Sequence, residues 1–134
     1  MNLLKYFTIY FNLNLIWCET MSGSQEQTQL LQRIQILSQQ ARVLQTRLFS
    51  LRARQRELQN ALSELEKAEN RGEKMVYQFI GANIIIEKDI KEVKQKLKDE
   101  LEIVNLQINS VEKQLNATMK TLKELSEKAG IKLQ

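Results

Sequence analysis

The feature that most constrains this 134-residue chain is a short β-type stretch that interrupts long heptad repeats. Residues 76–89 read VYQFIGANIIIEKD, which is an apolar run, a glycine turn and a second run with three consecutive isoleucines. A plain coiled coil has no use for such an insert, and an isolated two-stranded hairpin is only marginally stable in water. We therefore expect the hairpin to complete a sheet with other chains, which indicates an assembly subunit.

The predicted hairpin covers residues 76–87, and residues 81–83 form its turn because glycine and asparagine tolerate positive φ. Successive side chains of a strand point to opposite faces, so three isoleucines in a row make both faces apolar. Two apolar faces predict partners on both sides. The alternative is that residues 84–86 begin the second helix. The expected assembly residues are Val76, Tyr77, Phe79, Ile80, Gly81, Ile84, Ile85 and Ile86.

Apolar residues on either side of the hairpin follow heptad spacing. One stripe runs from Leu30 to Leu65 and only Gln55 breaks it, and a second runs over residues 90–129. The chain has no proline, so we expect two uninterrupted helices, over about residues 25–69 and 88–129. The first should end at Gly72, where glycine can take the positive φ of a helix stop. With the stripes facing each other, the predicted fold is dominated by α-helix: a long antiparallel two-helix coiled coil with one inserted β-hairpin.

Position within the heptads predicts which side chains pairing leaves uncovered. The second stripe passes through Leu115, Thr118 and Leu122, so Met119 lies beside it. Leu31 and Ile36 likewise lie off the first stripe. We expect pairing of the helices to leave Leu31, Ile36 and Met119 partly exposed.

The first twenty residues differ in character from the rest. They are apolar and aromatic, with one lysine, and they precede a polar sequence that begins at Met21. One interpretation is a leader or membrane anchor. The preferred interpretation is an upstream-start artefact or a dispensable extension, because Asn12 and Asn14 weaken the apolar core and Met21 resembles a natural start. The expected organisation is an extension over residues 1–20 and one domain over residues 21–134.

The composition argues against catalysis. The chain has no histidine, its single cysteine is Cys18, and its only aspartates are Asp89 and Asp99. No catalytic residues, metal ligands or cofactor-binding motif can be assigned from these residues, so we expect no enzyme activity and no cofactor. A single cysteine excludes an intramolecular disulfide and fits a reducing compartment.

The formal net charge is +4, and six arginines cluster on the first predicted helix. Their side chains would suit nucleic acid or an acidic partner. Their spacing follows the heptad positions outside the apolar stripe, however, so we favour a solvated helix face and expect no nucleic-acid binding. The six are Arg33, Arg42, Arg47, Arg52, Arg54 and Arg56.

The hairpin and its flanks resemble the β-type subunits of prefoldin. The most specific part is Val76-Tyr77-x-x-Ile80-Gly81, followed by the isoleucine-rich strand and by Lys88-Asp89 leading into the second helix. The resemblance covers about residues 25–129, and a single hairpin is the β-class pattern. Among eukaryotic members, the sixth subunit is the most similar. The extension over residues 1–20 departs from the family pattern.

This resemblance implies a function. Prefoldin is an ATP-independent cytoplasmic holdase in which α-type and β-type subunits join through their hairpins into a hetero-hexamer. Its coiled-coil tips capture unfolded clients such as actin and tubulin and pass them to the cytosolic chaperonin. For this chain the resemblance implies other prefoldin subunits as partners, with no membrane partner. It implies client-binding tips at Leu30, Leu31, Ile34, Met119, Leu122 and Leu125.

Two other classes of protein remain as alternatives. A structural coiled-coil adaptor or tether explains the heptads but leaves the hairpin unexplained. A nucleic-acid-binding helical hairpin would use the arginine cluster instead.

Overall fold

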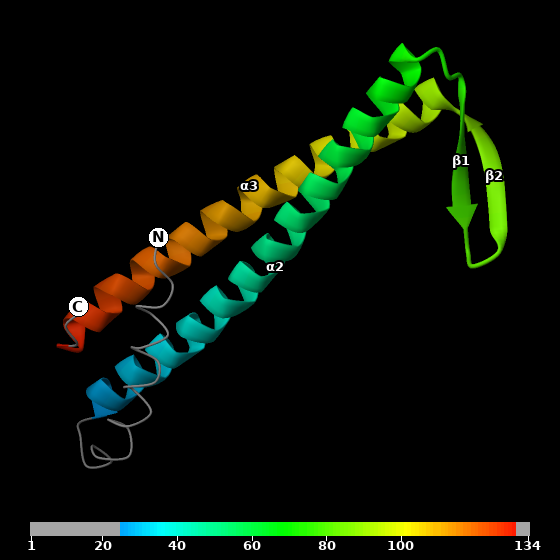
Figure 1. Cartoon of the computed structure of the whole chain (residues 1–134). Coiled ribbons are helices and arrows are strands. Elements are labelled where there is room, and N and C mark those ends of the chain that lie inside the picture. Colours follow the sequence, from blue (N-terminus) through cyan, green and yellow to red (C-terminus); the bar gives the residue numbers. More distant parts are fainter. Residues whose placement is uncertain (1–24, 131–134) are drawn as a thin grey trace. The chain divides into compact units, whose positions relative to one another are not determined.

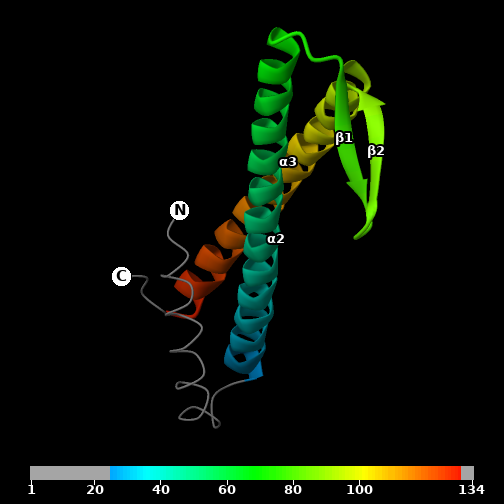
Figure 2. The same ribbon diagram turned by 45° about the vertical axis from the view of Figure 1, so that its right-hand side comes forward.

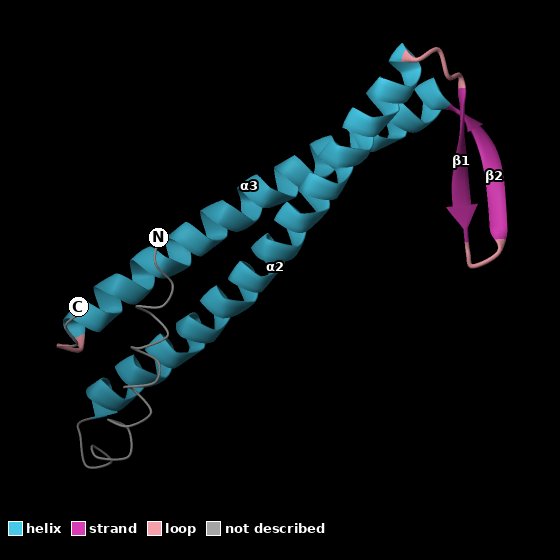
Figure 3. Ribbon diagram, in the orientation of Figure 1, coloured by secondary structure: helices cyan, strands magenta, loops and turns pink. Residues whose placement is uncertain are grey.

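The structure, a computed structural model, describes residues 25–130, which form two long helices separated by a β-hairpin (Figure 1). The elements are α2 (Gln25–Asn70), β1 (Met75–Ile80), β2 (Ile84–Asp89) and α3 (Ile90–Lys128). The predicted fold class is confirmed. The alternative in which residues 84–86 begin the second helix is wrong, because they pair as a strand with β1 (Figure 3). The extension over residues 1–20 lies outside the described residues.

Local sequence explains where the helices end and begin. Gly72 has φ 87°, its N–H donates to Glu69 O at 2.9 Å, and Glu73 N–H donates to Ala68 O at 3.1 Å. This bond pair is a Schellman motif, which uses a left-handed glycine to satisfy the last carbonyls of α2. At the start of α3, the Asp89 carboxylate accepts a bond from Lys91 N–H at 2.9 Å and so caps the helix.

The chain divides into two compact units. The terminal unit comprises residues 25–47 of α2 and the described residues from 111 onward in and after α3. The hairpin unit comprises residues 48–110, which include both strands. Each unit contains a segment of both helices and has its own buried residues.

In the terminal unit the two helical segments run antiparallel. Near its end, Gln27 Nε2 donates to Ala129 O at 3.4 Å, whereas Leu44, later in α2, lies with Gln114, earlier in α3. Both segments contribute buried apolar residues to the core of this unit. They are Leu31, Ile34, Ala41, Val111, Leu115, Met119, Leu122 and Leu125.

In the hairpin unit the helical segments are also antiparallel, and polar pairs link them. Lys94 Nζ donates to Glu69 at 2.9 Å, and Gln55 Nε2 donates to Asn105 Oδ1 at 2.7 Å. Gln55, the one polar residue in the first stripe, is therefore half-buried with a partner on the opposite helix. The buried apolar residues of this unit are Leu48, Leu58, Ala68, Ile90, Val104 and Ile108.

One prediction about exposure is wrong for two of its three residues. Leu31 is 4% exposed and Met119 is 2% exposed, so both belong to the core, although Ile36 is 57% exposed as expected. The half-buried Thr118 lies at the margin of that core. An α-helix of 3.6 residues per turn drifts about 20° per heptad relative to a 3.5-residue repeat. The contact face of α3 therefore moves from Thr118 to Met119.

Candidate assembly site

The hairpin is a regular antiparallel pair closed by a tight turn (Figure 2). Its register runs from Met75 opposite Asp89 to Ile80 opposite Ile84, which leaves residues 81–83 as the loop. Gly81 in this loop has φ 69°, a conformation in which any other residue except asparagine or aspartate is strained. The turn predicted from the sequence is confirmed.

The first face of the hairpin is exposed along its whole length. Tyr77 and Phe79 are each 72% exposed, and Ile85, directly opposite Phe79, is 55% exposed. Met75 lies on the same face and is 45% exposed. Opposed side chains in an antiparallel pair are close neighbours, so Phe79 and Ile85 form an apolar patch near the turn. Toward the base of the hairpin this face also carries two exposed carboxylates, Glu87 opposite Tyr77 and Asp89 opposite Met75.

The second face is partly covered. Val76 and Ile86 are half-buried, whereas the opposed Ile80 and Ile84 near the turn are 47% and 59% exposed. Both faces therefore offer apolar surface, as three consecutive isoleucines predict. All eight sequence-predicted hairpin residues lie in this pair of strands or its turn.

Both outer edges of the hairpin are available for pairing. Within residues 25–130 the sheet contains β1 and β2 alone, so each strand is paired along one edge only. The opposite edge of each strand presents backbone N–H and C=O groups that can pair with another chain. A segment with open edges and apolar faces suits the addition of strands on both sides.

Hydrogen bonds and ion pairs fix the base of the hairpin to the helices. Ile90 N–H donates to Lys74 O at 2.9 Å, which closes the base of the hairpin. Next to it, the hydrogen bond to the Glu69 carboxylate raises the pKa of Lys94. Further along α2, hydrogen bonds to Glu100 and Glu57 raise the pKa of Arg54.

The predicted client-binding residues all fall in the terminal unit. The structure brings them together, but five are buried, and only Leu30 is half-buried. Two other apolar residues of the unit are the exposed ones, Ile36 at 57% and Val43 at 67%. The buried five are Leu31, Ile34, Met119, Leu122 and Leu125.

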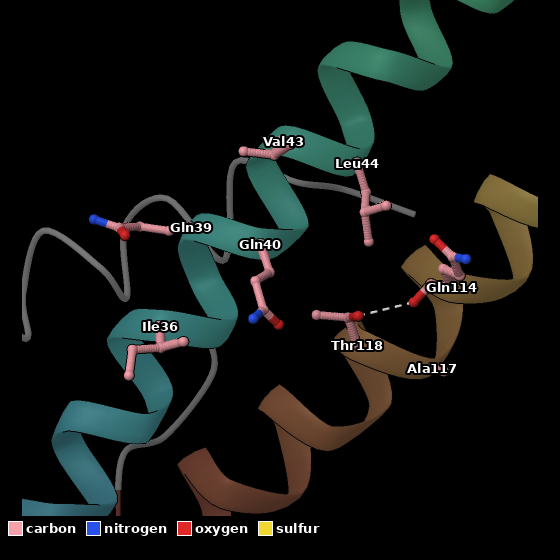
Figure 4. Close-up of a pocket in the computed structure, with 8 residues that line it drawn as sticks. All are labelled: Ile36, Gln39, Gln40, Val43, Leu44, Gln114, Ala117 and Thr118. Carbon is pink, nitrogen blue, oxygen red and sulfur yellow. Dashed lines mark hydrogen bonds between the residues drawn. The ribbon is translucent and has the colours of Figure 1, made fainter.

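Ile36 and Val43 line a groove of about 760 Å³. Leu44 and Gln40 extend from α2 toward Thr118 on α3, and Thr118 Oγ1 donates to Gln114 O at 2.8 Å (Figure 4). The other lining residues are Gln39, Gln114 and Ala117. The groove thus combines aliphatic side chains with amide groups, and it was not identified from the sequence.

The terminal unit also holds two hydroxyl groups in unusual positions. Ser126 is 0% exposed, and neither its Oγ nor the buried Oγ of Ser38 has a hydrogen-bond partner among the described residues. A buried polar group without a partner costs about 1–3 kcal/mol. The core of the terminal unit is therefore weakened at these two points.

Three further exposed apolar residues lie in the hairpin unit. Phe49 is 71% exposed, Ile103 is 56% exposed and Leu106 is 64% exposed. Sequence reasoning did not identify them as functional, although a large apolar residue outside the heptad stripe is a recognisable signal.

Over residues 25–130, no helix is apolar enough over a sufficient length to cross a membrane. In the same part of the chain, no group of three or more His, Cys, Asp or Glu residues is placed to hold a metal ion.

Comparisons with known proteins agree with this architecture. A family model described as prefoldin subunit matches residues 28–134. Among solved structures, the crystal structure of the prefoldin beta subunit from Thermococcus strain KS-1 is similar to this chain, with a TM-score of 0.71 and 20% sequence identity. The match covers 83% of this chain and 95% of that one. A search of curated proteins found no match.

Proposed function

This chain belongs to the prefoldin family, and on that premise we propose that it is a β-type subunit of a hetero-hexameric, ATP-independent holdase chaperone. In this proposal the complex captures unfolded polypeptides, such as actin and tubulin chains, and delivers them to the cytosolic chaperonin. We place the protein in the cytoplasm, and we assign it no enzymatic reaction. The assignment to the sixth position of the hexamer stays a prediction.

The exposed hairpin is the observation that carries this proposal. Tyr77 and Phe79 are each 72% exposed, and Ile84 and Ile85 are more than half exposed. Burying one large apolar side chain contributes about 1.5–3 kcal/mol, so burial of this surface strongly favours association. The two open edges add backbone pairing to that apolar contact.

Co-expression with an α-type prefoldin subunit tests the proposed assembly. We expect the chain alone to aggregate and the mixture to elute as one defined hexamer in size-exclusion chromatography. The Ile85→Val variant should assemble normally, because it keeps a β-branched apolar side chain at this position. A stable monomer with an ordered hairpin, unaffected by the partner, would contradict the proposal.

For client capture we propose a role for the terminal unit. Ile36 and Val43 provide apolar surface that is exposed in the closed unit. The larger set of predicted client-binding residues would become available when the two helical segments separate locally. The hydroxyls of Ser38 and Ser126, buried without partners among the described residues, support this idea because they lower the cost of separation. Weak contacts from several subunits would then hold a client through avidity.

A double substitution of the exposed pair tests capture separately from assembly. We expect Ile36→Ser with Val43→Ser to leave the hexamer intact and to weaken suppression of client aggregation, measured by light scattering after dilution of a denatured client. Phe49→Ser is the control, because it removes an apolar residue of comparable exposure from the hairpin unit. Equal protection by the double variant and the wild type would exclude this groove from client capture.

A further inference from the structure

The groove of the terminal unit is an uncharged surface. Its eight lining residues carry aliphatic, amide or hydroxyl side chains, and none of the eight is acidic or basic. Ile36 and Val43, its two exposed aliphatic residues, are seven positions apart and therefore lie on one face of α2. Gln40 extends from α2 toward Thr118 on α3 (Figure 4). The groove therefore suits an occupant that combines apolar side chains with a few hydrogen-bonding groups and little charge.

A segment of this chain outside the described residues has that composition. Residues 3–17, here called the apolar segment, contain eleven apolar or aromatic residues and a single charged one, Lys5. The other three are Thr8, Asn12 and Asn14, whose side chains can exchange hydrogen bonds with amide groups such as those of the groove. The apolar segment thus matches the groove in both its apolar and its polar groups.

The linker between the apolar segment and α2 is long enough to reach the groove. Residues 18–24 separate Trp17 from Gln25, and the eight Cα steps between these two residues span at most about 26–29 Å. Ile36 and Val43 lie 11 and 18 residues beyond Gln25, or about 17 and 27 Å along α2. The end of the apolar segment can therefore return along α2 as far as either of the two residues.

We propose that the apolar segment docks in the groove of its own chain and covers Ile36 and Val43. Docking removes apolar surface of both the segment and the groove from water, which favours the contact. A short tether also gives the segment an effective concentration of about millimolar at the groove, so weak contacts are sufficient. A second copy of the chain lacks this advantage, because it must bind from solution.

Docking has a consequence for client capture, and this consequence rests on the proposed function. A client that binds at Ile36 and Val43 must displace the apolar segment, so segment and client compete for the same surface. The apparent affinity for the client falls by the fraction of chains in which the groove is open. Assembly is unaffected, since the docked segment uses neither strand of the hairpin.

Photo-crosslinking tests the docking in the full chain. The photoreactive residue p-benzoylphenylalanine replaces Phe11, and the chain is co-expressed with an α-type prefoldin subunit, irradiated and digested with trypsin. Cleavage after lysine and arginine places all eight groove residues in three peptides, residues 34–42, 43–47 and 114–120. We expect crosslinks to these peptides and their loss when Ile36→Ser and Val43→Ser are added. Phe49→Ser, which lies outside the groove, should retain them.

Three results would overturn the docking proposal. The first is the absence of crosslinks to the three peptides, or crosslinks to peptides of the hairpin unit in their place. The second is survival of the groove crosslinks in the double serine variant. The third is a crosslink that joins an isotope-labelled chain to an unlabelled one when both are refolded together, because the occupant would then come from a second copy.

Client protection distinguishes failure of this inference from failure of the proposed capture function. Phe7→Ser with Phe11→Ser should weaken docking, so hexamers with this variant should suppress client aggregation better than the wild type. If the groove crosslinks form but neither this variant nor the double groove variant changes client protection, docking is confirmed and capture at the groove is contradicted. If the groove variant protects less well but the segment variant protects no better than the wild type, competition by the segment is overturned.

Discussion

The buried hydroxyl of Ser126 gives the sharpest test of how the terminal unit works. Ser126 is 0% exposed, and its Oγ has no partner among the described residues. Replacing it by alanine removes a desolvation cost of about 1–3 kcal/mol. Alanine also has the higher helix propensity, which adds about 0.5 kcal/mol. We therefore expect Ser126→Ala to stabilise the terminal unit.

Native-state hydrogen exchange in the assembled complex measures this effect where it should occur. Since tenfold in an equilibrium constant corresponds to about 1.4 kcal/mol, exchange of the α3 amides after residue 111 should slow by at least about tenfold. Amides of the hairpin unit should be unaffected. If capture requires local opening, the same variant should protect a denatured client less well than the wild type.

The matched control is Asn116→Ala, which lies in the same part of α3 at an exposed position. Asparagine and serine have similar helix propensities, so this change reports the propensity gain alone. If Ser126→Ala slows exchange no more than Asn116→Ala does, the hydroxyl is not a weak point. If exchange slows but client protection is unchanged, opening is not required for capture.

Three further predictions concern the hairpin unit. Ile85→Asp should abolish the hexamer in size-exclusion chromatography while circular dichroism shows little loss of helix, because a charge would enter an apolar sheet between subunits. Gln55→Leu should lower the free energy of unfolding by about 1 kcal/mol, because it removes the 2.7 Å hydrogen bond to the half-buried Asn105 amide. Adding Asn105→Leu should recover most of that loss, as measured by chemical denaturation. The hydrogen bond to Glu69 raises the pKa of Lys94. The stability that this bond contributes should therefore be complete below the ordinary lysine pKa and should disappear as the pH rises through the elevated pKa, and thermal unfolding at increasingly alkaline pH would follow that loss.

A specific experimental result would contradict each of these predictions. A normal hexamer from Ile85→Asp would remove the hairpin from the assembly surface. Additive losses from the two leucine substitutions would show that Gln55 and Asn105 are not coupled. For the ion pair, Lys94→Met should lose the alkaline transition while Lys96→Met, at an exposed position, retains it. An identical pH profile in both variants would assign the transition to other groups.

The fold was predictable because its main signals are local. Heptad spacing predicts the two helices, Gly72 predicts the end of α2, and the run from Val76 to Ile86 predicts the hairpin and its turn. The side of each helix that becomes buried was harder to predict. Met119 is buried because small rotations accumulate over several turns, which a strict seven-residue repeat does not represent. The bond between Gln55 and Asn105 depends on the register between two helices, which the sequence of either one does not contain.

The candidate site also contains residues that local sequence predicts and residues that it does not. The hairpin residues were identified because their exposure follows from having no covering layer within the chain. The groove of the terminal unit was missed because residues of both helices line it, and only the register between the helices brings them together. The exposed Phe49, Ile103 and Leu106 were missed because they lie outside the heptad stripe.

The two open edges of the hairpin have a consequence for how a cell must supply this protein. A chain with one open edge on each side is bivalent, so every copy made in excess of its partners keeps both edges unsatisfied. Such copies can pair with one another without a defined end point, which is the behaviour of an aggregating chain. Balanced synthesis of the subunits, or rapid degradation of unassembled copies, would therefore be as important to its cellular abundance as its own folding stability.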